Sequence, residues 1–215
     1  MTRRSLKESL HYLVGALLLE LALHPLGLLR GRLLLATGGG CLFFFRDPDR
    51  AVGTDPDTVY APSDGVIADV EVVRDEWLEG DALRIGTFLA LYDVHVNRSP
   101  ASGTITLGEE IAGGYAPAFA RRASANHRKR LAIDDAERRV VLVQIAGLVA
   151  RSISSWAWTG DTLRAGDRMA IIHFGSRTEV LLPATEARAV VAPGDRVKGG
   201  VTPIARYFND RAGPR

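Results

Sequence analysis

Cysteine is nearly absent from the sequence: Cys41 is the only one among 215 residues. A single cysteine excludes an internal disulfide and any metal site built from several cysteines. A large net charge is missing too, because 27 basic and 25 acidic residues leave a formal charge of +2. So small a charge gives no reason to expect a nucleic acid as a partner. Cys41 lies within an apolar run, which predicts a small buried side chain.

Long apolar runs are also absent, although the first 45 residues are rich in leucine. The apolar segments 12–23 and 33–45 both fall short of the roughly 20 residues that span a bilayer comfortably. They lie on either side of His24-Pro25, and basic residues precede the first of them. Three interpretations fit: a cleaved signal peptide, a pair of buried globular helices, or a helical hairpin embedded in a membrane or lying on it. We favour the membrane hairpin, because no small-residue cleavage site follows the basic start.

The composition changes at residues 46–50, where charges and a proline end the apolar region. We therefore expect an N-terminal hydrophobic, membrane-associating helical region over 1–50 and a β-rich domain over 51–215. β-Branched stretches between turn signals predict strands in this second domain. These stretches are 66–73, 83–91, 140–145, 169–174 and 179–182. Residues 116–130, rich in alanine and arginine, instead suggest a helix or a mobile loop.

Two turns give a hint about the architecture. The Gly-Asp turns at 160–167 and 194–200 are similar to hairpins of barrel-sandwich domains of the biotinyl/lipoyl kind. The fold class that we expect is mainly β (α+β), with a compact barrel-sandwich-like β domain after the helical hairpin. Such a likeness concerns architecture and carries no activity.

The pair Gly175-Ser176 follows a short apolar run. A serine after a glycine can attack the carbonyl that precedes it, because glycine has no side chain to block the approach. The attack replaces a peptide bond by an ester, which can then break. A Gly-Ser pair by itself is a common turn, so only its context can indicate chemistry.

Five ordered segments supply that context. They are 43–48 (FFFRDP), 61–65 (APSDG), 88–100 (FLALYDVHVNRSP), 147–151 (GLVAR) and 174–177 (FGSR). In order and spacing they resemble the short, single-barrel class of phosphatidylserine decarboxylase proenzymes, and the resemblance covers nearly the whole chain.

The resemblance implies an enzyme that processes itself. Ser176 would attack the Gly175 carbonyl, and β-elimination would then cut the chain into a β chain of residues 1–175 and an α chain of residues 176–215. Residue 176 would become a pyruvoyl group, which forms a Schiff base with the substrate amine and accepts the electrons released with CO2. No metal and no pyridoxal phosphate is implied. The two chains would remain together as a heterodimer, and a higher oligomer is open.

The resemblance also assigns roles to single residues. Gly175 and Ser176 form the cleavage site, and Ser176 carries the Schiff base. His95 is the candidate for proton transfer. Asp64 matches the aspartate that orients the general base for self-cleavage in longer members of the family. From the residue alone, Asp64 would be read as a turn-stabilising aspartate.

One position departs from the longer members, which have a second histidine where this chain has Arg98. Arginine cannot accept a proton at neutral pH. It can hold a carboxylate or phosphate through its planar fork, so we assign Arg98 to substrate binding, together with Asn97 and Arg177. Either His95 serves as the only base or another residue supplies one, and His173 is a helper candidate. If residues 173–176 form a strand, His173 and Ser176 point to opposite faces, which argues against this helper.

The substrate implied is a membrane phospholipid, phosphatidylserine, and the products are phosphatidylethanolamine and CO2. We therefore expect the protein at the cell membrane, peripheral or anchored by the hairpin, on the cytoplasmic face. Two rivals stay open. One is a pyruvoyl decarboxylase for another serine-headgroup lipid or for a soluble amino acid; the other is a membrane-anchored barrel-sandwich adaptor without catalysis.

Overall fold

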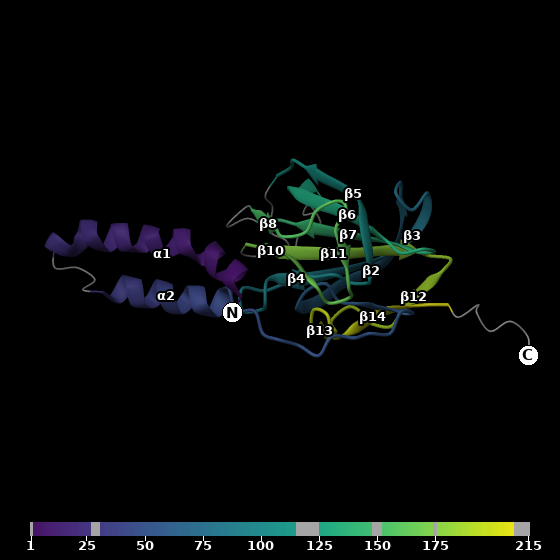
Figure 1. The fold of residues 1–215 in the computed structure, drawn as a ribbon, viewed down its shortest axis with the longest axis horizontal. Helices are drawn as coiled ribbons and strands as arrows, with labels where there is room; N and C mark the ends of the chain where they lie inside the picture. The colour runs from purple at the N-terminus through teal and green to yellow at the C-terminus, as the bar shows by residue number, and fades with distance from the viewer. Residues whose placement is uncertain (1, 27–30, 115–124, 148–151, 174–175, 209–215) are drawn as a thin grey trace, which may run out of the picture. The chain divides into compact units, whose positions relative to one another are not determined.

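The computed structural model describes residues 2–26, 31–114, 125–147, 152–173 and 176–208 (Figure 1). The chain divides into two compact units, Met1–Asp49 and Arg50–Arg215. The first unit is helical and the second is built from β-strands.

The helical unit consists of α1 (Arg3–Leu23), the 3-10 turn η1 (His24–Leu26) and α2 (Arg32–Phe44). The side chain of Thr2 caps α1 by accepting a hydrogen bond from the Ser5 amide at 3.3 Å. Near the other end of α1 the buried Glu20 carboxylate accepts a hydrogen bond from the amide of Gly31. The two predicted helices, with a break at His24-Pro25, are confirmed.

A membrane-embedded hairpin is not supported. Among the described helices, none combines the length and apolar character that a membrane crossing requires. The helices nevertheless expose many large apolar side chains: Leu6, Leu10, Val14, Leu17, Leu18, Leu19 and Leu21 on α1, and Leu35, Leu42 and Phe43 on α2.

The second unit confirms the prediction of a mainly β fold. Its strands have 2 to 11 residues, and the pairings between the described strands are antiparallel. They are β1 (Thr58–Tyr60), β2 (Gly65–Asp75), β3 (Gly80–Leu89), β4 (Val96–Arg98), β5 (Gly103–Ile111), β6 (Arg128–Asp134), β7 (Arg139–Ile145), β8 (Ile153–Ser155), β9 (Thr162–Leu163), β10 (Arg168–Ile172), β11 (Ser176–Pro183), β12 (Ala187–Ala189), β13 (Arg196–Val197) and β14 (Pro203–Tyr207).

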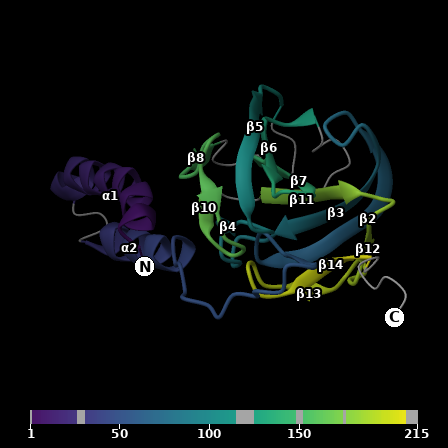
Figure 2. The same cartoon turned by 45° about the vertical axis from the view of Figure 1, so that its right-hand side comes forward.

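The strands form one large sheet and two small ones. The large sheet has the order β13-β2-β3-β11-β7-β6-β5-β9, and the small sheets have the orders β4-β10-β8 and β1-β14-β12. Figures 1 and 2 show the sheet of β4, β10 and β8 beside the beginning of β11. The strand β11 lies in the interior of the large sheet, with β3 on one side and β7 on the other.

The expectation of a helix or mobile loop over 116–130 is wrong at its end, because β6 begins at Arg128. The side chain of Lys129 is buried: it bonds Ser155 at 2.6 Å and lies over the ring of Trp158. Alanine and arginine content suggested a helix, but cross-strand partners decide the conformation here. Residues 115–124 of that segment lie outside the described residues.

The middle strands of the large sheet have apolar side chains on both faces. Val140 and Leu142 of β7 and Val180 and Leu182 of β11 belong to the main core, whereas Val141, Val143 and Leu181 belong to a second cluster. Since side chains alternate along a strand, Gln144 continues the main-core face of β7, and Ser176 and Thr178 continue that of β11. The end of the main core is therefore polar where β11 begins.

Gly65 permits the close approach of β2 and β3. Its φ is +154°, and an added Cβ would lie 2.1 Å from the carbonyl oxygen of Phe88. A backbone oxygen cannot swing away as a side chain can, so Gly65→Ala is expected to lower the free energy of unfolding by about 2–4 kcal/mol. Denaturant unfolding measures this loss.

The matched control is Gly194→Ala. Gly194 also has a positive φ, +97°, but nothing lies within 4 Å of its added Cβ. We expect it to lose only about 1–2 kcal/mol, the cost of a left-handed backbone. Equal losses in the two variants would show that the contact with Phe88 is not what requires glycine.

Candidate active site

Ser176 is the first residue of β11, opposite Leu89 of β3. It is fully buried, and among the described residues its Oγ has no hydrogen-bond partner. A buried polar atom without a partner costs about 1–3 kcal/mol, so its presence calls for an explanation. Gly175, the other half of the predicted cleavage site, lies outside the described residues.

His95 precedes β4 and is also fully buried. Its Nδ1 lies 2.9 Å from the carbonyl oxygen of Asp93. A carbonyl oxygen only accepts hydrogen bonds, so Nδ1 must carry the hydrogen. In the neutral ring, Nε2 then carries no hydrogen and is the basic nitrogen. A general base needs the ring in this neutral form.

Two connections bring the His95 segment to the beginning of β11. The first is β10, which pairs with β4 so that Ile171 lies opposite Val96. The amide of Ile172, four residues before Ser176, lies 3.4 Å from the His95 carbonyl oxygen. The second runs through side chains: Asn97 of β4 contacts Gln144 of β7, and Gln144 lies opposite Thr178 of β11.

The resemblance implies that Asp64 orients the general base, but in the structure its carboxylate is bound by Arg50. Its carboxylate forms a two-pronged ion pair with Arg50, at 2.5 and 2.8 Å, and accepts the amide of Gly199 at 2.9 Å. Arg50 also donates to the Gly199 carbonyl at 2.8 Å. These contacts tie three distant parts of the β unit together, and the role of Asp64 toward the general base stays a prediction.

Asn97 and Arg98, which the sequence analysis assigned to substrate binding, are both buried. Arg98 donates to the Gly166 carbonyl at 3.0 Å. Asn97 donates from Nδ2 to the His95 carbonyl at 3.1 Å, and its Oδ1 accepts from Gln144 at 2.9 Å. The nitrogen and the oxygen of the Asn97 amide are therefore both engaged inside the protein.

Arg177 lies on the face of β11 opposite to Ser176. Its guanidinium bonds both oxygens of Asp69, at 2.8 and 2.7 Å, and Glu179 at 2.8 Å. Burial acts to lower the pKa of Arg177, but the two carboxylates outweigh it and raise the pKa above its usual value. These contacts favour a role in anchoring the beginning of β11.

His173 follows β10 and is buried. Its Nε2 lies 3.2 Å from the Ser154 hydroxyl. Its amide donates to the carbonyl of Ser152 at 3.1 Å, which continues the pairing of β10 with β8. The stretch that would connect His173 to Ser176 lies outside the described residues, so its role as a helper stays a prediction.

Gln144 is a buried polar residue beside the candidate site that the sequence analysis missed. It is fully buried on β7, and it contacts Asn97. The signal was present: in the run 139–145 (RVVLVQI), glutamine occupies an inward position that Val140 and Leu142 fill four and two residues earlier. A polar residue at an inward position of an apolar strand must have a buried partner.

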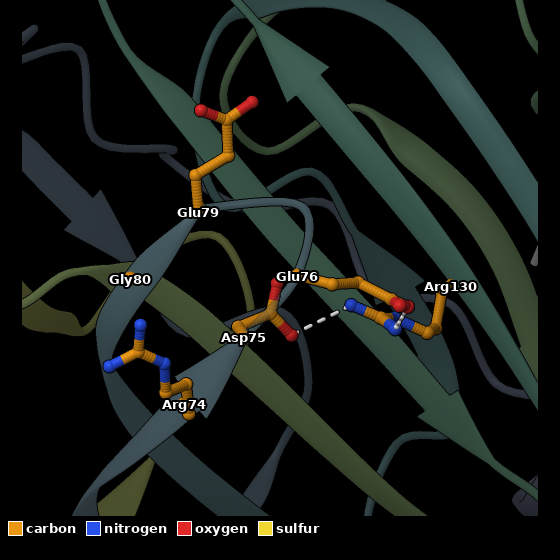
Figure 3. Close-up of a pocket in the computed structure, with 6 residues that line it drawn as sticks. All are labelled: Arg74, Asp75, Glu76, Glu79, Gly80 and Arg130. Atoms are coloured by element: carbon orange, nitrogen blue, oxygen red, sulfur yellow. Dashed lines mark hydrogen bonds and ion pairs between the residues drawn. The ribbon is translucent and has the colours of Figure 1, made fainter.

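A pocket at the turn between β2 and β3 is a poor candidate for a site (Figure 3). It is lined by Arg74, Asp75, Glu76, Glu79, Gly80 and Arg130. Arg130 bonds Asp75 at 2.7 Å and Glu76 at 2.8 Å, so the guanidinium and both carboxylates are engaged with one another. The pocket also lies at the opposite end of β3 from Leu89, the partner of Ser176. Within the described ranges, no group of three or more histidine, cysteine or carboxylate side chains could hold a metal ion.

Comparison with known proteins gives one consistent result. A family model described as phosphatidylserine decarboxylase matches residues 40–205. The phosphatidylserine decarboxylase proenzyme of Carboxydothermus hydrogenoformans is 41% identical over 167 residues, which cover 77% of this chain and 78% of the relative. That of Symbiobacterium thermophilum is 38% identical over 199 residues, 91% of this chain and 85% of the relative. That of Ralstonia nicotianae is 41% identical over 166 residues, 76% and 77% of the two chains. The span that the family model matches contains Ser176, His95 and Gln144.

Proposed function

The chain belongs to the phosphatidylserine decarboxylase family, and on this premise we propose how its own residues act. The protein is an enzyme that decarboxylates phosphatidylserine to phosphatidylethanolamine and CO2. Like its relatives, which are named proenzymes, it is made as a precursor that processes itself. The observation that carries the assignment is the buried Ser176 hydroxyl, which has no partner among the described residues and lies where β11 begins.

Self-cleavage begins at this hydroxyl. The Ser176 Oγ–H bond breaks as His95 Nε2 takes the proton, and Oγ forms a bond to the carbonyl carbon of Gly175. The carbon–nitrogen bond of the peptide then breaks, and the proton moves to the amide nitrogen of residue 176. The product is an ester between Gly175 and the side chain of Ser176.

The ester then opens by elimination. A proton leaves Cα of residue 176, the bond between Cβ and Oγ breaks, and Gly175 is released as a carboxylate. The dehydroalanine at 176 tautomerises to an imine, water adds, and ammonia leaves, so that a pyruvoyl group ends the α chain. This group supplies a carbonyl that bonds the substrate amine and takes up the electron pair freed with CO2.

The two products of the cut are expected to remain associated. The proposed α chain contributes β11, which lies between β3 and β7, and β13 and β14, which pair with β2 and β1. Side chains add further links across the cut: the Ser63 and Thr178 hydroxyls lie 2.8 Å apart, and Arg177 bonds Asp69. We therefore expect both chains to co-purify under native conditions and to separate only in denaturant.

We also propose that the helical unit associates with the membrane that holds the substrate. Its exposed leucines, such as Leu10, Leu18 and Leu21 on α1 and Leu35 on α2, form an apolar surface that water does not favour. Burial in the lipid interface would remove this surface from water without a crossing.

Electrophoresis and a lipid assay test the proposal together. In denaturant, the purified protein should give two bands, the smaller matching residues 176–215 in mass and resisting Edman degradation at its blocked end. The same preparation should release CO2 from phosphatidylserine in mixed micelles and not from free serine. An intact chain without CO2 release would favour the adaptor, and release from free serine alone would point to a soluble substrate.

A further inference from the structure

Three buried groups form a chain of hydrogen bonds from β7 to the His95 segment. Gln144 donates from Nε2 to Asn97 Oδ1 at 2.9 Å, and Asn97 donates from Nδ2 to the His95 carbonyl at 3.1 Å. All three residues are fully buried. The first of these contacts joins distant parts of the sequence, because Gln144 and Asn97 are 47 residues apart.

The orientation of both side-chain amides follows from the last acceptor in this series of hydrogen bonds, the His95 carbonyl. The His95 carbonyl can only accept, so Asn97 must present its Nδ2 to it. Asn97 Oδ1 then faces Gln144, which must donate a hydrogen bond from its NH2 group. Flipping either amide would place two acceptors or two donors against each other, so the arrangement has a fixed direction.

These hydrogen bonds matter for the position of His95, because the segment that contains it lies outside the strands. Residues 90–95 link β3 to β4, and Leu91 and Tyr92 at the tip are exposed. Ile172 approaches the His95 carbonyl only at 3.4 Å. Gln144, by contrast, belongs to a strand within the large sheet and lies opposite Thr178, two residues from Ser176 on the same face.

We propose that Gln144 is a positioning residue for self-cleavage. Through Asn97 it holds the backbone at His95 in register with the beginning of β11, and so keeps the imidazole in the place from which it takes the Ser176 proton in the proposed cleavage. This inference rests on the proposed function, and it moves Asn97 from substrate binding to the positioning of His95.

Substitution of Gln144 by glutamate gives a specific test. The ionised carboxylate of the Q144E variant cannot donate to Asn97 Oδ1, whereas the protonated carboxyl can. Burial raises the pKa of a carboxyl, so protonation occurs in a range of pH that the protein can tolerate. The processing rate of Q144E relative to the unchanged protein should therefore rise about 5- to 10-fold from about pH 8 to about pH 5.5. Taking the ratio to the unchanged protein at each pH removes the pH dependence that both proteins share.

The rates are measured on full-length labelled precursor, made by translation in vitro and then shifted to each pH. Gln144→Leu should slow processing roughly 10- to 100-fold, with a ratio that does not change with pH. Thr58→Val is the control for stability, because it removes one hydrogen bond of a buried side chain, that from the Thr58 hydroxyl to the exposed Asp55 at 2.7 Å, in a different sheet. It should process at the normal rate.

The outcomes separate the two proposals. Processing of Gln144→Leu at the normal rate would overturn the role of Gln144. A Q144E ratio that stays flat with pH would also overturn it, and this measurement decides the matter even if Gln144→Leu fails to fold. A rise in the ratio that merely follows the thermal stability of the Q144E precursor at each pH would overturn it as well, because protonation also removes the cost of a buried charge. If the unchanged protein itself stays intact, the proposed function fails and the role of Gln144 fails with it.

Discussion

Ser176→Ala is expected to leave the precursor as one intact chain of 215 residues, with no detectable release of CO2 from phosphatidylserine. Alanine has no oxygen to attack the Gly175 carbonyl, so the peptide bond cannot become an ester. Without the ester no carbonyl forms at residue 176, and decarboxylation is lost together with cleavage. Denaturing electrophoresis and mass measurement follow the first effect, and an assay of CO2 follows the second.

Two comparisons make this result specific. Ser102→Ala removes a hydroxyl that accepts the Ala165 amide at 3.0 Å in an exposed turn, and it should be processed normally. Ser176→Thr keeps the oxygen but adds a methyl group at a fully buried position, so cleavage should persist but be slower, by about 100-fold. If Ser176→Ala is still cut between residues 175 and 176, the mechanism proposed for this protein is wrong.

His95→Gln is expected to slow self-cleavage by about 100- to 10,000-fold while the protein remains folded. Glutamine can still donate to the Asp93 carbonyl, which His95 Nδ1 contacts at 2.9 Å, but it has no basic nitrogen to replace Nε2. Precursor made by translation in vitro gives the rate, and thermal unfolding shows that the fold is retained.

His127→Gln is the matched control for this variant. The His127 imidazole lies 3.0 Å from the Glu110 carboxylate of β5, a strand that two others separate from β11 in the large sheet, so its loss should leave processing unchanged. His173→Gln addresses the question of which histidine is the base. A loss in His173→Gln as large as that in His95→Gln would mean that proton transfer does not depend on His95 alone. Normal processing of His95→Gln would exclude it as the base.

His95 is oriented by a backbone carbonyl, and not by a carboxylate as in the simple serine–histidine–aspartate pattern. Its Nδ1 contacts a backbone carbonyl, that of Asp93, while the Asp64 carboxylate is engaged by Arg50. A carbonyl fixes the tautomer of a neutral imidazole as well as a carboxylate does, but it stabilises the protonated ring less. His95 is therefore suited to take a proton for a short time and to return it, as the acyl shift requires.

The strand pattern and the reactive pair could be predicted from the sequence because both depend on neighbouring residues. Alternation and turn residues predicted strands that the structure contains as β2, β3, β7, β10 and β11. The break between the helices followed from His24-Pro25, because proline interrupts the helical hydrogen bonds. The exception was the start of β6 at Arg128, where a segment rich in alanine and arginine suggested a helix or a mobile loop and the cross-strand partners favoured a strand.

The partners of the charged and polar site residues could not be predicted. Asp64 meets Gly199, Arg177 meets Asp69, and Asn97 meets Gln144, and the two members of each pair lie far apart along the chain. Such pairs depend on which strands are neighbours and in what register, and a shift of one residue turns every side chain to the other face.

The sequence by itself determined that this protein is a mainly β member of its family with a Gly-Ser pair as its proposed scission point. Only the tertiary structure decided that the Ser176 hydroxyl is buried without a partner among the described residues, that Nε2 is the basic nitrogen of neutral His95, and that Gln144 connects the His95 segment to the large sheet. The reason is physical. Reactivity of a residue type is a local property of the chain, whereas burial and hydrogen-bond partners arise only when distant strands pack together.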